Sequence, residues 1–383
     1  MAPVIIIGSG MAGYGVAREF RKLDKTAPLL IITADSGNAY SKPMLSNALT
    51  KGKTATSLVT ANADSMAQQL NAEIRTITQV SQINSTAHDI EIAGERIPYA
   101  KLVMALGADP FRPPLQGNGA DDVISVNDLM DYDRFRSAID GKQKIAILGG
   151  GLIGCEFAND LADNGFQVEI IDRNPWPLGR LLPEALGRQL QQGLESLDVH
   201  WHGEDTATTV ERSANGYSLT LESGAHVETD LVLSAIGLRP RTALAKQTGL
   251  AVERGIVVDQ YLQSSANDIY ALGDCAEVAG LLLPFVAPLM RASRALAQTL
   301  TGNTTAVVYP AMPVMLKTPV YPISVLPPPP GVDGQWEISD ESGAMRALFL
   351  SPEGTLRGFA LGGKAASEGN KLAQDIPGLL NSL

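Results

Sequence analysis

Two glycine-rich turns of the same kind occur in this chain, GSGMAG at residues 8–13 and GGGLIG at residues 149–154. Each turn follows a short apolar run typical of a buried parallel strand and precedes a segment with helical periodicity. This glycine spacing binds a dinucleotide when a strand precedes it and a helix follows it, because amides at the helix N-terminus then face the pyrophosphate. One such turn can arise by chance, whereas two in the same context predict a chain that holds two dinucleotides.

The composition argues against several other classes of protein. With 383 residues, 45% of them hydrophobic, the chain is long enough for two or three well-packed domains. Its net charge of −11 argues against a nucleic-acid partner, since binding to a phosphate backbone needs a basic face. No apolar run is long enough to span a bilayer, and the first strand begins without a charged leader, so we expect no membrane insertion.

The cysteines and histidines predict neither a disulfide framework nor a metal centre. Cys155 and Cys275 are far apart and each lies inside a motif, so we interpret both as packing residues in a reducing, cytoplasmic setting. The histidines show no metal-ligand spacing, and the HWH segment is most simply a strand with two histidines on one face. The histidines are His88, His200, His202 and His226.

An acidic residue is expected after the second strand of each dinucleotide unit, where it binds a ribose hydroxyl. In the first unit the expected strand is 29–33, and Asp35 is the only acidic candidate after it, with Thr33 and Ala34 where a Glu often lies. We therefore expect the segment Thr33-Ala34-Asp35 to contact the ribose or adenine. In the second unit Asp172 ends the strand about 20 residues beyond the turn, which favours NADH. Arg173 and Arg180 could accept a 2′-phosphate instead and keep NADPH open as an alternative.

Two similar apolar strands mark places where the chain crosses between domains. Residues 102–108 are an apolar run that ends in Gly107-Ala108 and is followed by several prolines, and residues 231–240 repeat much of that pattern. The chain therefore leaves one domain and later returns to it. The composition changes beyond Pro310, so we expect an α/β fold with a small C-terminal α+β domain. The predicted domains are residues 1–112 with 232–308, residues 113–231, and residues 309–383.

Residues 267–276 form a strand that ends in Gly273-Asp274 and closely resembles the second FAD motif of the glutathione-reductase-like flavoproteins, which bind FAD and NAD on two Rossmann-like domains. The resemblance implies that Asp274 binds the ribitol chain, that residues 8–13 hold FAD and that residues 149–154 hold NADH. It covers the chain from residue 4 to about residue 301, with all its motifs in order, and 105–107 and 235–237 match its two crossing strands.

The branch of the family is indicated by residues 38–46, NAYSKPMLS, which stand where disulfide reductases carry a C-x-x-x-x-C pair. Lys42-Pro43, together with the segment that ends in Glu156, resembles the ferredoxin-reductase and apoptosis-inducing-factor branch, in which the lysine and glutamate pair near flavin N5. Bacterial rubredoxin–NAD(+) reductases are resembled by residues 32–35, 40–46, 151–161 and 315–319, and the resemblance extends to residues 333–336. Flavorubredoxin reductases of nitric oxide detoxification share many of these stretches and stay a close alternative.

The resemblance implies hydride transfer from NADH to FAD and single-electron transfer to rubredoxin, a small acidic iron protein. Lys42, Glu156 and Lys317 are the predicted catalytic residues, with Glu156 paired to Lys42 so that a cation favours the anionic reduced flavin. The residues predicted to contact the dinucleotides are Gly8, Ser9, Gly10, Met11, Ala12, Gly13, Thr33, Ala34, Asp35, Lys42, Pro43, Val80, Ala105, Gly107, Gly149, Gly151, Ile153, Gly154, Glu156, Asp172, Gly237, Gly273, Asp274, Val286 and Lys317.

The electron acceptor is left open by the residues themselves. The family resemblance implies an alkane hydroxylase system downstream of rubredoxin, while a ferredoxin, a flavorubredoxin or oxygen are alternative acceptors. A non-catalytic flavoprotein that senses NADH is an alternative of a different class. The acceptor surface should be less acidic than the whole chain, and its conceivable basic residues are Arg239, Arg241, Arg291 and Arg294.

Overall fold

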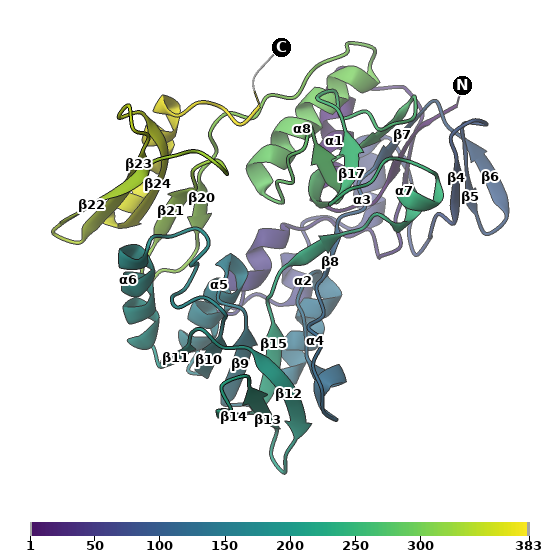
Figure 1. The fold of residues 1–383 in the computed structure, drawn as a ribbon. Helices are drawn as coiled ribbons and strands as arrows, with labels where there is room; N and C mark the ends of the chain where they lie inside the picture. Colours follow the sequence, from purple (N-terminus) through teal and green to yellow (C-terminus); the bar gives the residue numbers. More distant parts are fainter. Residues whose placement is uncertain (1, 381–383) are drawn as a thin grey trace.

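The computed structural model describes residues 2–380, whose three largest sheets are two parallel sheets and one antiparallel sheet (Figure 1). The first sheet has five strands in the order β18-β7-β1-β2-β3, and every neighbouring pair is parallel. It joins segments from both ends of the first 300 residues, as a chain that leaves a domain and returns to it must. The strands are β1 (Val4–Ile7), β2 (Leu29–Ile32), β3 (Glu73–Arg75), β7 (Lys101–Met104) and β18 (Ile269–Ala271).

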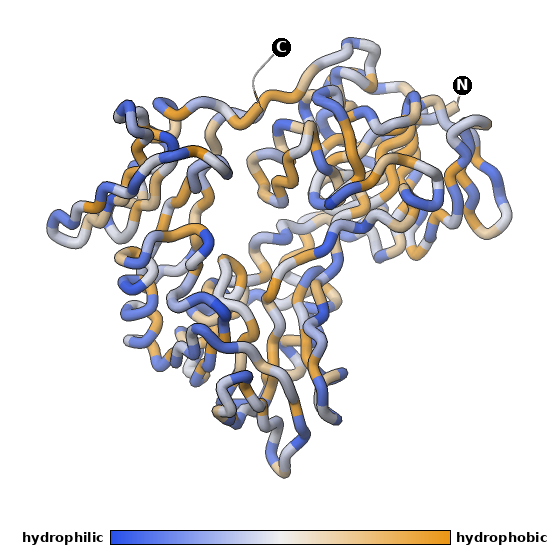
Figure 2. Tube along the Cα trace, in the orientation of Figure 1, coloured by the Kyte–Doolittle hydropathy of each residue, from blue (hydrophilic) through white to orange (hydrophobic). Residues whose placement is uncertain are grey.

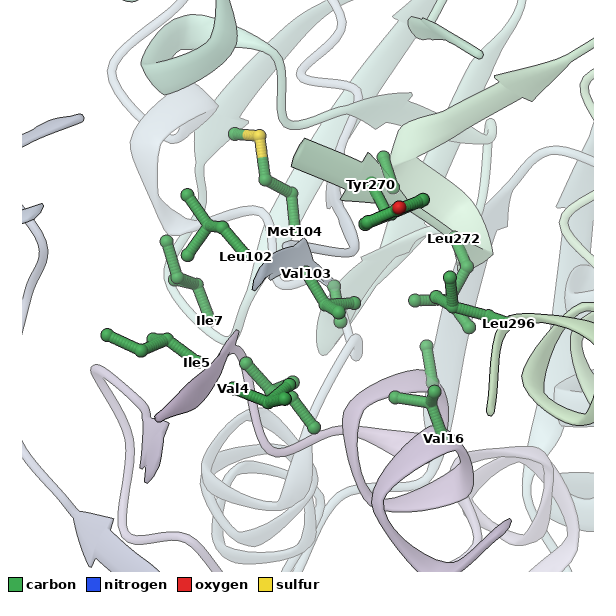
Figure 3. Close-up of a cluster of buried hydrophobic side chains, with 14 of the residues drawn as sticks. Val4, Ile5, Ile7, Val16, Leu102, Val103, Met104, Tyr270, Leu272 and Leu296 are labelled. Atoms are coloured by element: carbon green, nitrogen blue, oxygen red, sulfur yellow. The ribbon is translucent and has the colours of Figure 1, made fainter. Parts of the chain in front are cut away.

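Apolar residues occupy consecutive positions on β1, β2, β7 and β18 because both faces of the sheet are covered, whereas the edge strand β3 is Glu-Ile-Arg. Helices α1 (Met11–Leu23) and α8 (Val286–Leu300) contact one another closely, and Gly15 of α1 lies beside Ser293 of α8. Figure 3 shows Val16 and Leu296 of these helices packed near Val103 and Leu272, and all four side chains are buried. In Figure 2 the central strands of this region are coloured hydrophobic.

Smaller elements surround the first sheet. A three-stranded antiparallel sheet lies at its outer side in Figure 1, and a two-stranded parallel pair follows the return of the chain. These elements are β4 (Gln82–Asn84), β5 (Asp89–Ile92), β6 (Glu95–Pro98), β17 (Ile256–Val258), β19 (Ala276–Val278), α3 (Ala63–Leu70) and α7 (Ala243–Gln247). Helix α2 (Ala55–Leu58) instead packs through Leu58 in the apolar cluster of the second sheet.

The second sheet has four parallel strands in the order β11-β10-β9-β15. Helices pack on one face through a large apolar cluster, and an antiparallel meander covers the other face through a smaller cluster that includes Val210 and Leu219. The elements are β9 (Lys144–Leu148), β10 (Gln167–Ile171), β11 (Val199–His202), β15 (Leu231–Ser234), β12 (Ala207–Arg212), β13 (Tyr217–Leu221), β14 (His226–Thr229), α4 (Leu129–Ala138), α5 (Leu152–Ala162) and α6 (Glu184–Glu195).

The two crossings between the parallel sheets lie side by side. Strands β8 (Ala108–Pro110) and β16 (Leu238–Pro240) pair antiparallel, so the outgoing and returning segments support one another. Arg241 follows β16, and its side chain donates to Asp109 at 2.7 Å and to the Leu106 carbonyl at 3.2 Å. This pair of crossings fixes where the two sheets meet.

The C-terminal region is a five-stranded antiparallel sheet in the order β20-β21-β24-β23-β22. Ile323, Val325 and Ala360 of this sheet belong to the same apolar cluster as the helices of the second sheet, so the two regions share a core. Its elements are β20 (Val314–Leu316), β21 (Ile323–Leu326), β22 (Gln335–Glu341), β23 (Ala344–Leu350), β24 (Leu356–Gly363) and α9 (Gly369–Leu372).

The predicted fold class, parallel sheets followed by a small C-terminal domain, is confirmed by these sheets. The predicted domain boundaries stay a prediction. Among residues 2–380, no helix combines the length and the apolarity that crossing a bilayer requires. Over the same residues, no three His, Cys, Asp or Glu side chains are grouped as metal ligands would be.

Candidate functional site

A single large cleft of about 2800 Å³ is lined by both glycine turns and by the C-terminal sheet. Its volume is several times that of a typical site for one small ligand, which is ~300–1,000 Å³. Of the residues predicted to contact a dinucleotide, all line this cleft except Gly13, Gly154 and Gly273. The fold therefore brings together residues that are more than 300 positions apart in the sequence, such as Gly8 and Lys317.

The first turn connects β1 to α1 and depends on three glycines for different reasons. Gly8 has φ of +111°, and a Cβ there would lie 2.2 Å from the Ala105 carbonyl oxygen. A Cβ on Gly13 would lie 1.9 Å from the Gly8 carbonyl oxygen. Gly10, the N-cap of α1, has no protein atom within 4 Å of its Cβ position, and no side chain caps the helix. The free helix N-terminus and the open space at Gly10 form a cradle for an anion.

The second turn, between β9 and α5, repeats the same construction. Gly149 has φ of +101°, and its Cβ position is 2.8 Å from the Ala235 carbonyl oxygen. A Cβ on Gly154 would lie 1.9 Å from the Gly149 carbonyl oxygen, while the Cβ position of Gly151 is open and the helix again lacks a side-chain cap. Both turns thus fit the pyrophosphate of a dinucleotide, and each rests on one of the two crossing strands.

The acidic residues that follow the second strand of each unit lie beside the turns. Oδ1 of Asp35 accepts hydrogen bonds from Ser9 Oγ at 3.0 Å and from Thr33 Oγ1 at 2.8 Å, so Asp35 ties the first turn to the end of β2. Oδ2 of Asp172 accepts from the Gly150 amide at 2.6 Å, and Asp172 lies directly after β10. Arg173 is turned to Thr206 and donates to its hydroxyl at 3.0 Å.

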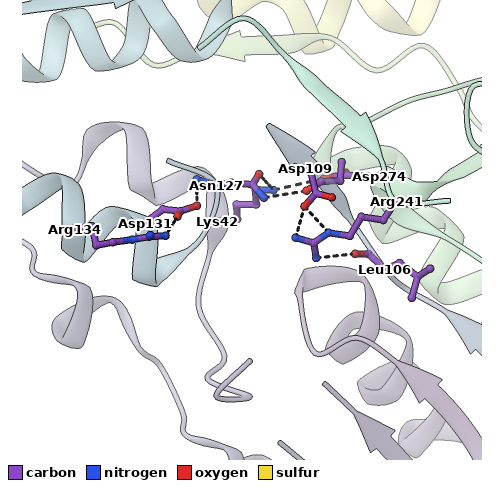
Figure 4. A network of polar contacts seen from close by, with 9 residues as sticks. Lys42, Leu106, Asp109, Asn127, Asp131, Arg134, Arg241 and Asp274 are labelled. Atoms are coloured by element: carbon purple, nitrogen blue, oxygen red, sulfur yellow. Dashed lines mark hydrogen bonds and ion pairs between the residues drawn. The ribbon is translucent and has the colours of Figure 1, made fainter. Parts of the chain in front are cut away.

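The predicted ion pair between Glu156 and Lys42 is wrong. Lys42 Nζ donates to Oδ1 of Asn127 at 2.7 Å and lies 3.8 Å from Oδ2 of Asp274 (Figure 4). Lys42 therefore lies beside the aspartate that the sequence assigns to the ribitol chain. Loss of solvation inside the cleft lowers the pKa of Lys42, and Asp274 acts in the opposite direction.

Glu156 binds Lys317 in place of Lys42. Glu156 is 4% exposed on α5, and its Oε2 accepts from Lys317 Nζ at 3.2 Å and from the Ser46 hydroxyl. Its Oε1 accepts from the Lys317 backbone amide at 3.0 Å. Lys317 Nζ also donates to the Pro43 carbonyl. Lys317 follows β20 and so approaches α5 from the C-terminal sheet, which gives Glu156 a partner closer than Lys42.

Two further polar residues of α5 were missed by the sequence reasoning. Oδ1 of Asn159 accepts from the Val320 amide at 3.2 Å, and the Asp160 carboxylate accepts from the amides of Leu49 and Thr50, both at 2.9 Å. Burial raises the pKa of Asp160. Glu156, Asn159 and Asp160 are spaced i, i+3, i+4 in an otherwise mostly apolar helix, a pattern that places them on one face and was visible in the sequence.

The two cysteines are buried, as expected of packing residues. Burial raises the pKa of the Cys275 thiol to about 11, and it raises the pKa of the Cys155 thiol even more. Neither thiol therefore ionises readily at neutral pH. The Cys155 Sγ lies 3.4 Å from the Gly150 carbonyl oxygen as a weak donor.

The proposed basic residues lie in two places. Arg239 stacks over Phe111 and Arg241 is bound to Asp109, both at the rim of the cleft, while Arg291 and Arg294 are exposed on α8.

Comparison with known protein families gives two matches along the chain. Residues 2–299 match the pyridine nucleotide-disulphide oxidoreductase family, and residues 306–376 match the rubredoxin binding C-terminal domain. The chain is 49% identical to a rubredoxin-NAD(+) reductase of Alcanivorax borkumensis, over 99% of this chain and 100% of that protein. It is 36% identical to a nitric oxide reductase FlRd-NAD(+) reductase of Vibrio vulnificus, over 98% of each chain.

Among solved structures, a ferredoxin reductase of Rhodopseudomonas palustris has the same fold. The TM-score is 0.89, the sequence identity is 24%, and the match covers 98% of this chain and 96% of that chain.

Proposed function

The chain belongs to the pyridine nucleotide-disulphide oxidoreductase family, and on that premise we propose that it is a flavoprotein reductase that passes electrons from NADH through FAD to rubredoxin. The observation that carries the proposal is the cleft itself, since one cavity is lined by two dinucleotide turns and by Lys317 of a region matching a rubredoxin binding domain. The 49% identity to a rubredoxin-NAD(+) reductase over the whole chain supports the same acceptor.

The residues of the cleft divide naturally between two cofactors. We assign FAD to residues 1–112 with 232–308, where the turn at 8–13, Asp35 and Asp274 would hold its pyrophosphate, ribose and ribitol. We assign NADH to residues 113–231, where the turn at 149–154 and Asp172 would hold it. Residues 309–383 would dock the acceptor. FAD, when bound, supplies the exchange between a two-electron hydride donor and a one-electron acceptor.

The two lysines would tune that exchange by their charge. Lys42 lies 3.8 Å from Asp274, and Lys317 is held by Glu156, so both ammonium groups are fixed inside the cleft. A cation in a partly dehydrated site favours an anionic reduced flavin by Coulomb attraction. In this proposal Glu156 positions Lys317, and Lys42 depends on other partners.

Replacing Asp172 with alanine is expected to raise the KM for NADH roughly tenfold or more, since hydrogen bonds to a charged group contribute about 1.5–3 kcal/mol. The preference for NADH over NADPH should narrow, because the carboxylate would otherwise repel a 2′-phosphate. Steady-state kinetics with both nucleotides measures the ratio of the KM for NADPH to the KM for NADH. Arg173→Ala is the matched control and should leave the ratio unchanged, because Arg173 is turned to Thr206. An unchanged ratio in D172A would contradict the assignment.

A second acceptor is favoured by one observation. The chain is 36% identical over nearly its full length to a protein named for flavorubredoxin reduction, so flavorubredoxin is the alternative to rubredoxin. We propose that the electrons finally reach an alkane hydroxylase system, a proposal that rests on the family resemblance. We also propose that the protein is located in the cytoplasm, because its two cysteines are buried free thiols.

The experiment that tests the function is stopped-flow mixing of the purified holoprotein with NADH and then with oxidised rubredoxin. Flavin and iron absorbance are followed together. Fast flavin bleaching and fast rubredoxin reduction are expected. Fast bleaching with slow rubredoxin reduction would move the acceptor to flavorubredoxin or a ferredoxin. Slow bleaching with a long-lived charge-transfer complex would favour an NADH-sensing flavoprotein instead.

A further inference from the structure

Lys42 is held by a residue that belongs to none of the dinucleotide motifs. Asn127 is 7% exposed and lies in the segment that enters the second sheet, just before α4. Its Oδ1 accepts from Lys42 Nζ at 2.7 Å, its Nδ2 donates to the Ala108 carbonyl at 2.9 Å, and its backbone amide donates to Oδ2 of Asp131 at 3.0 Å (Figure 4). The Asn127 side chain therefore joins two other segments, those of Lys42 and Ala108, and the bond from its backbone amide to Asp131 fixes it to the start of α4.

We propose that Asn127 is a positioning residue that holds the Lys42 ammonium in the cleft and thereby helps set the reduction potential of the flavin. The inference rests on the proposed function, because it requires FAD in the first dinucleotide site. It concerns a residue of the crossing segment, and the glycine turns and the acceptor surface play no part in it.

The amide chemistry of Asn127 suits this task better than a carboxylate. The side chain must accept from an ammonium on one side and donate to a carbonyl on the other, and an amide does both, whereas an ionised carboxylate only accepts. A neutral acceptor also orients the ammonium without cancelling its charge. A carboxylate at position 127 would form a close ion pair with Lys42 and weaken the positive field that reaches the flavin.

None of the charged groups around Lys42 lies as close to its ammonium as Asn127 does. Asp274 at 3.8 Å is the nearest carboxylate, and Asp128 and Asp131 act from the start of α4. Arg241 opposes them, but its guanidinium is bound to Asp109 and to the Leu106 carbonyl. The contact with Asn127 is therefore the shortest polar contact that fixes the direction of the Lys42 side chain.

The test is a double-mutant cycle on the midpoint potential of bound FAD in the holoprotein. Wild type, N127A, K42M and N127A/K42M are titrated with a reductant against a reference dye. We expect N127A to lower the potential by a large part of the K42M shift, and the double variant to match K42M alone. The matched control is Asn118→Ala. Asn118 lies in the same crossing segment, and its Oδ1 accepts from the Arg212 backbone amide where that of Asn127 accepts from Lys42. Asn118 is exposed and outside the cleft, so no shift of the potential is expected.

A second variant keeps the test decisive if N127A folds poorly. N127D preserves the size of the side chain and should lower the potential, because its charge opposes that of Lys42. An N127A or N127D protein with wild-type potential would overturn the inference. Equal shifts from N127A in the presence and absence of Lys42 would also overturn it, because Asn127 would then act without the lysine. Rubredoxin does not enter this measurement, so failure of the acceptor assay leaves it unaffected, whereas a wild-type protein that binds no FAD overturns both proposals.

Discussion

Alanine at Gly13 is expected to abolish FAD binding and to destabilise the fold, whereas alanine at Gly10 is expected to abolish FAD binding alone. A Cβ on Gly13 would lie 1.9 Å from the Gly8 carbonyl oxygen and 2.9 Å from its carbon. Both atoms are backbone, so α1 or β1 would have to move, and overpacking of this kind costs about 1–3 kcal/mol. At Gly10 the Cβ would meet no protein atom within 4 Å, and its φ of −66° suits alanine. The loss of FAD binding in the Gly10 variant therefore comes only from the exclusion of the pyrophosphate by the added methyl group.

The measurement is flavin absorbance per protein together with the thermal unfolding of the apoprotein. G10A should unfold within about 0.5 kcal/mol of the wild-type apoprotein, as is usual for an open surface position. Gly151→Ala and Gly154→Ala form the matched pair in the second turn. They should keep FAD but raise the KM for NADH, and only G154A should be destabilised. A G10A protein that retains FAD with unchanged affinity would show that the pyrophosphate lies elsewhere.

The parts of the fold that follow local rules could be predicted from the sequence. The apolar runs at residues 4–7 and 145–148 are buried strands, and the glycines after them adopt the positive φ that the turn requires. The return of the chain was also predictable, because residues 231–240 repeat the pattern of the first crossing. The crossings pair as β8 and β16, and the C-terminal region forms its own sheet.

The partners of the charged side chains could not be predicted in the same way. Both Lys42 and Lys317 were expected near the flavin, but which one reaches Glu156 depends on how the C-terminal sheet docks on α5. That docking is set by apolar contacts, such as those of Leu316 and Ile323 with the second domain. Contacts between residues so far apart leave no local pattern in the sequence. Asn127 carries no motif at all. Asp160 is different, because a polar residue one helical turn from Glu156 on a buried helix was a readable signal.

The second large effect is a loss of stability, which we expect when Glu156 is replaced by glutamine. Its two carboxylate oxygens receive the Lys317 amide, the Lys317 ammonium and the Ser46 hydroxyl, so every partner is a donor. In Glu156→Gln, one oxygen becomes an NH₂ group that faces a donor. A buried donor left without an acceptor costs about 1–3 kcal/mol, and the loss falls where the two dinucleotide regions and the C-terminal sheet meet.

We expect the Lys317 ammonium to contribute less to stability than those neutral donors. The Lys317 side chain is 38% exposed, and an ion pair of that exposure is worth about 1 kcal/mol or less. In Lys317→Met the backbone amide at position 317 and the Ser46 hydroxyl still donate to Glu156. We therefore expect E156Q to lower the denaturant midpoint of the holoprotein clearly more than K317M does. The reverse order would mean that the ion pair dominates this junction and that the hydrogen bonds to the Lys317 amide and Ser46 contribute little.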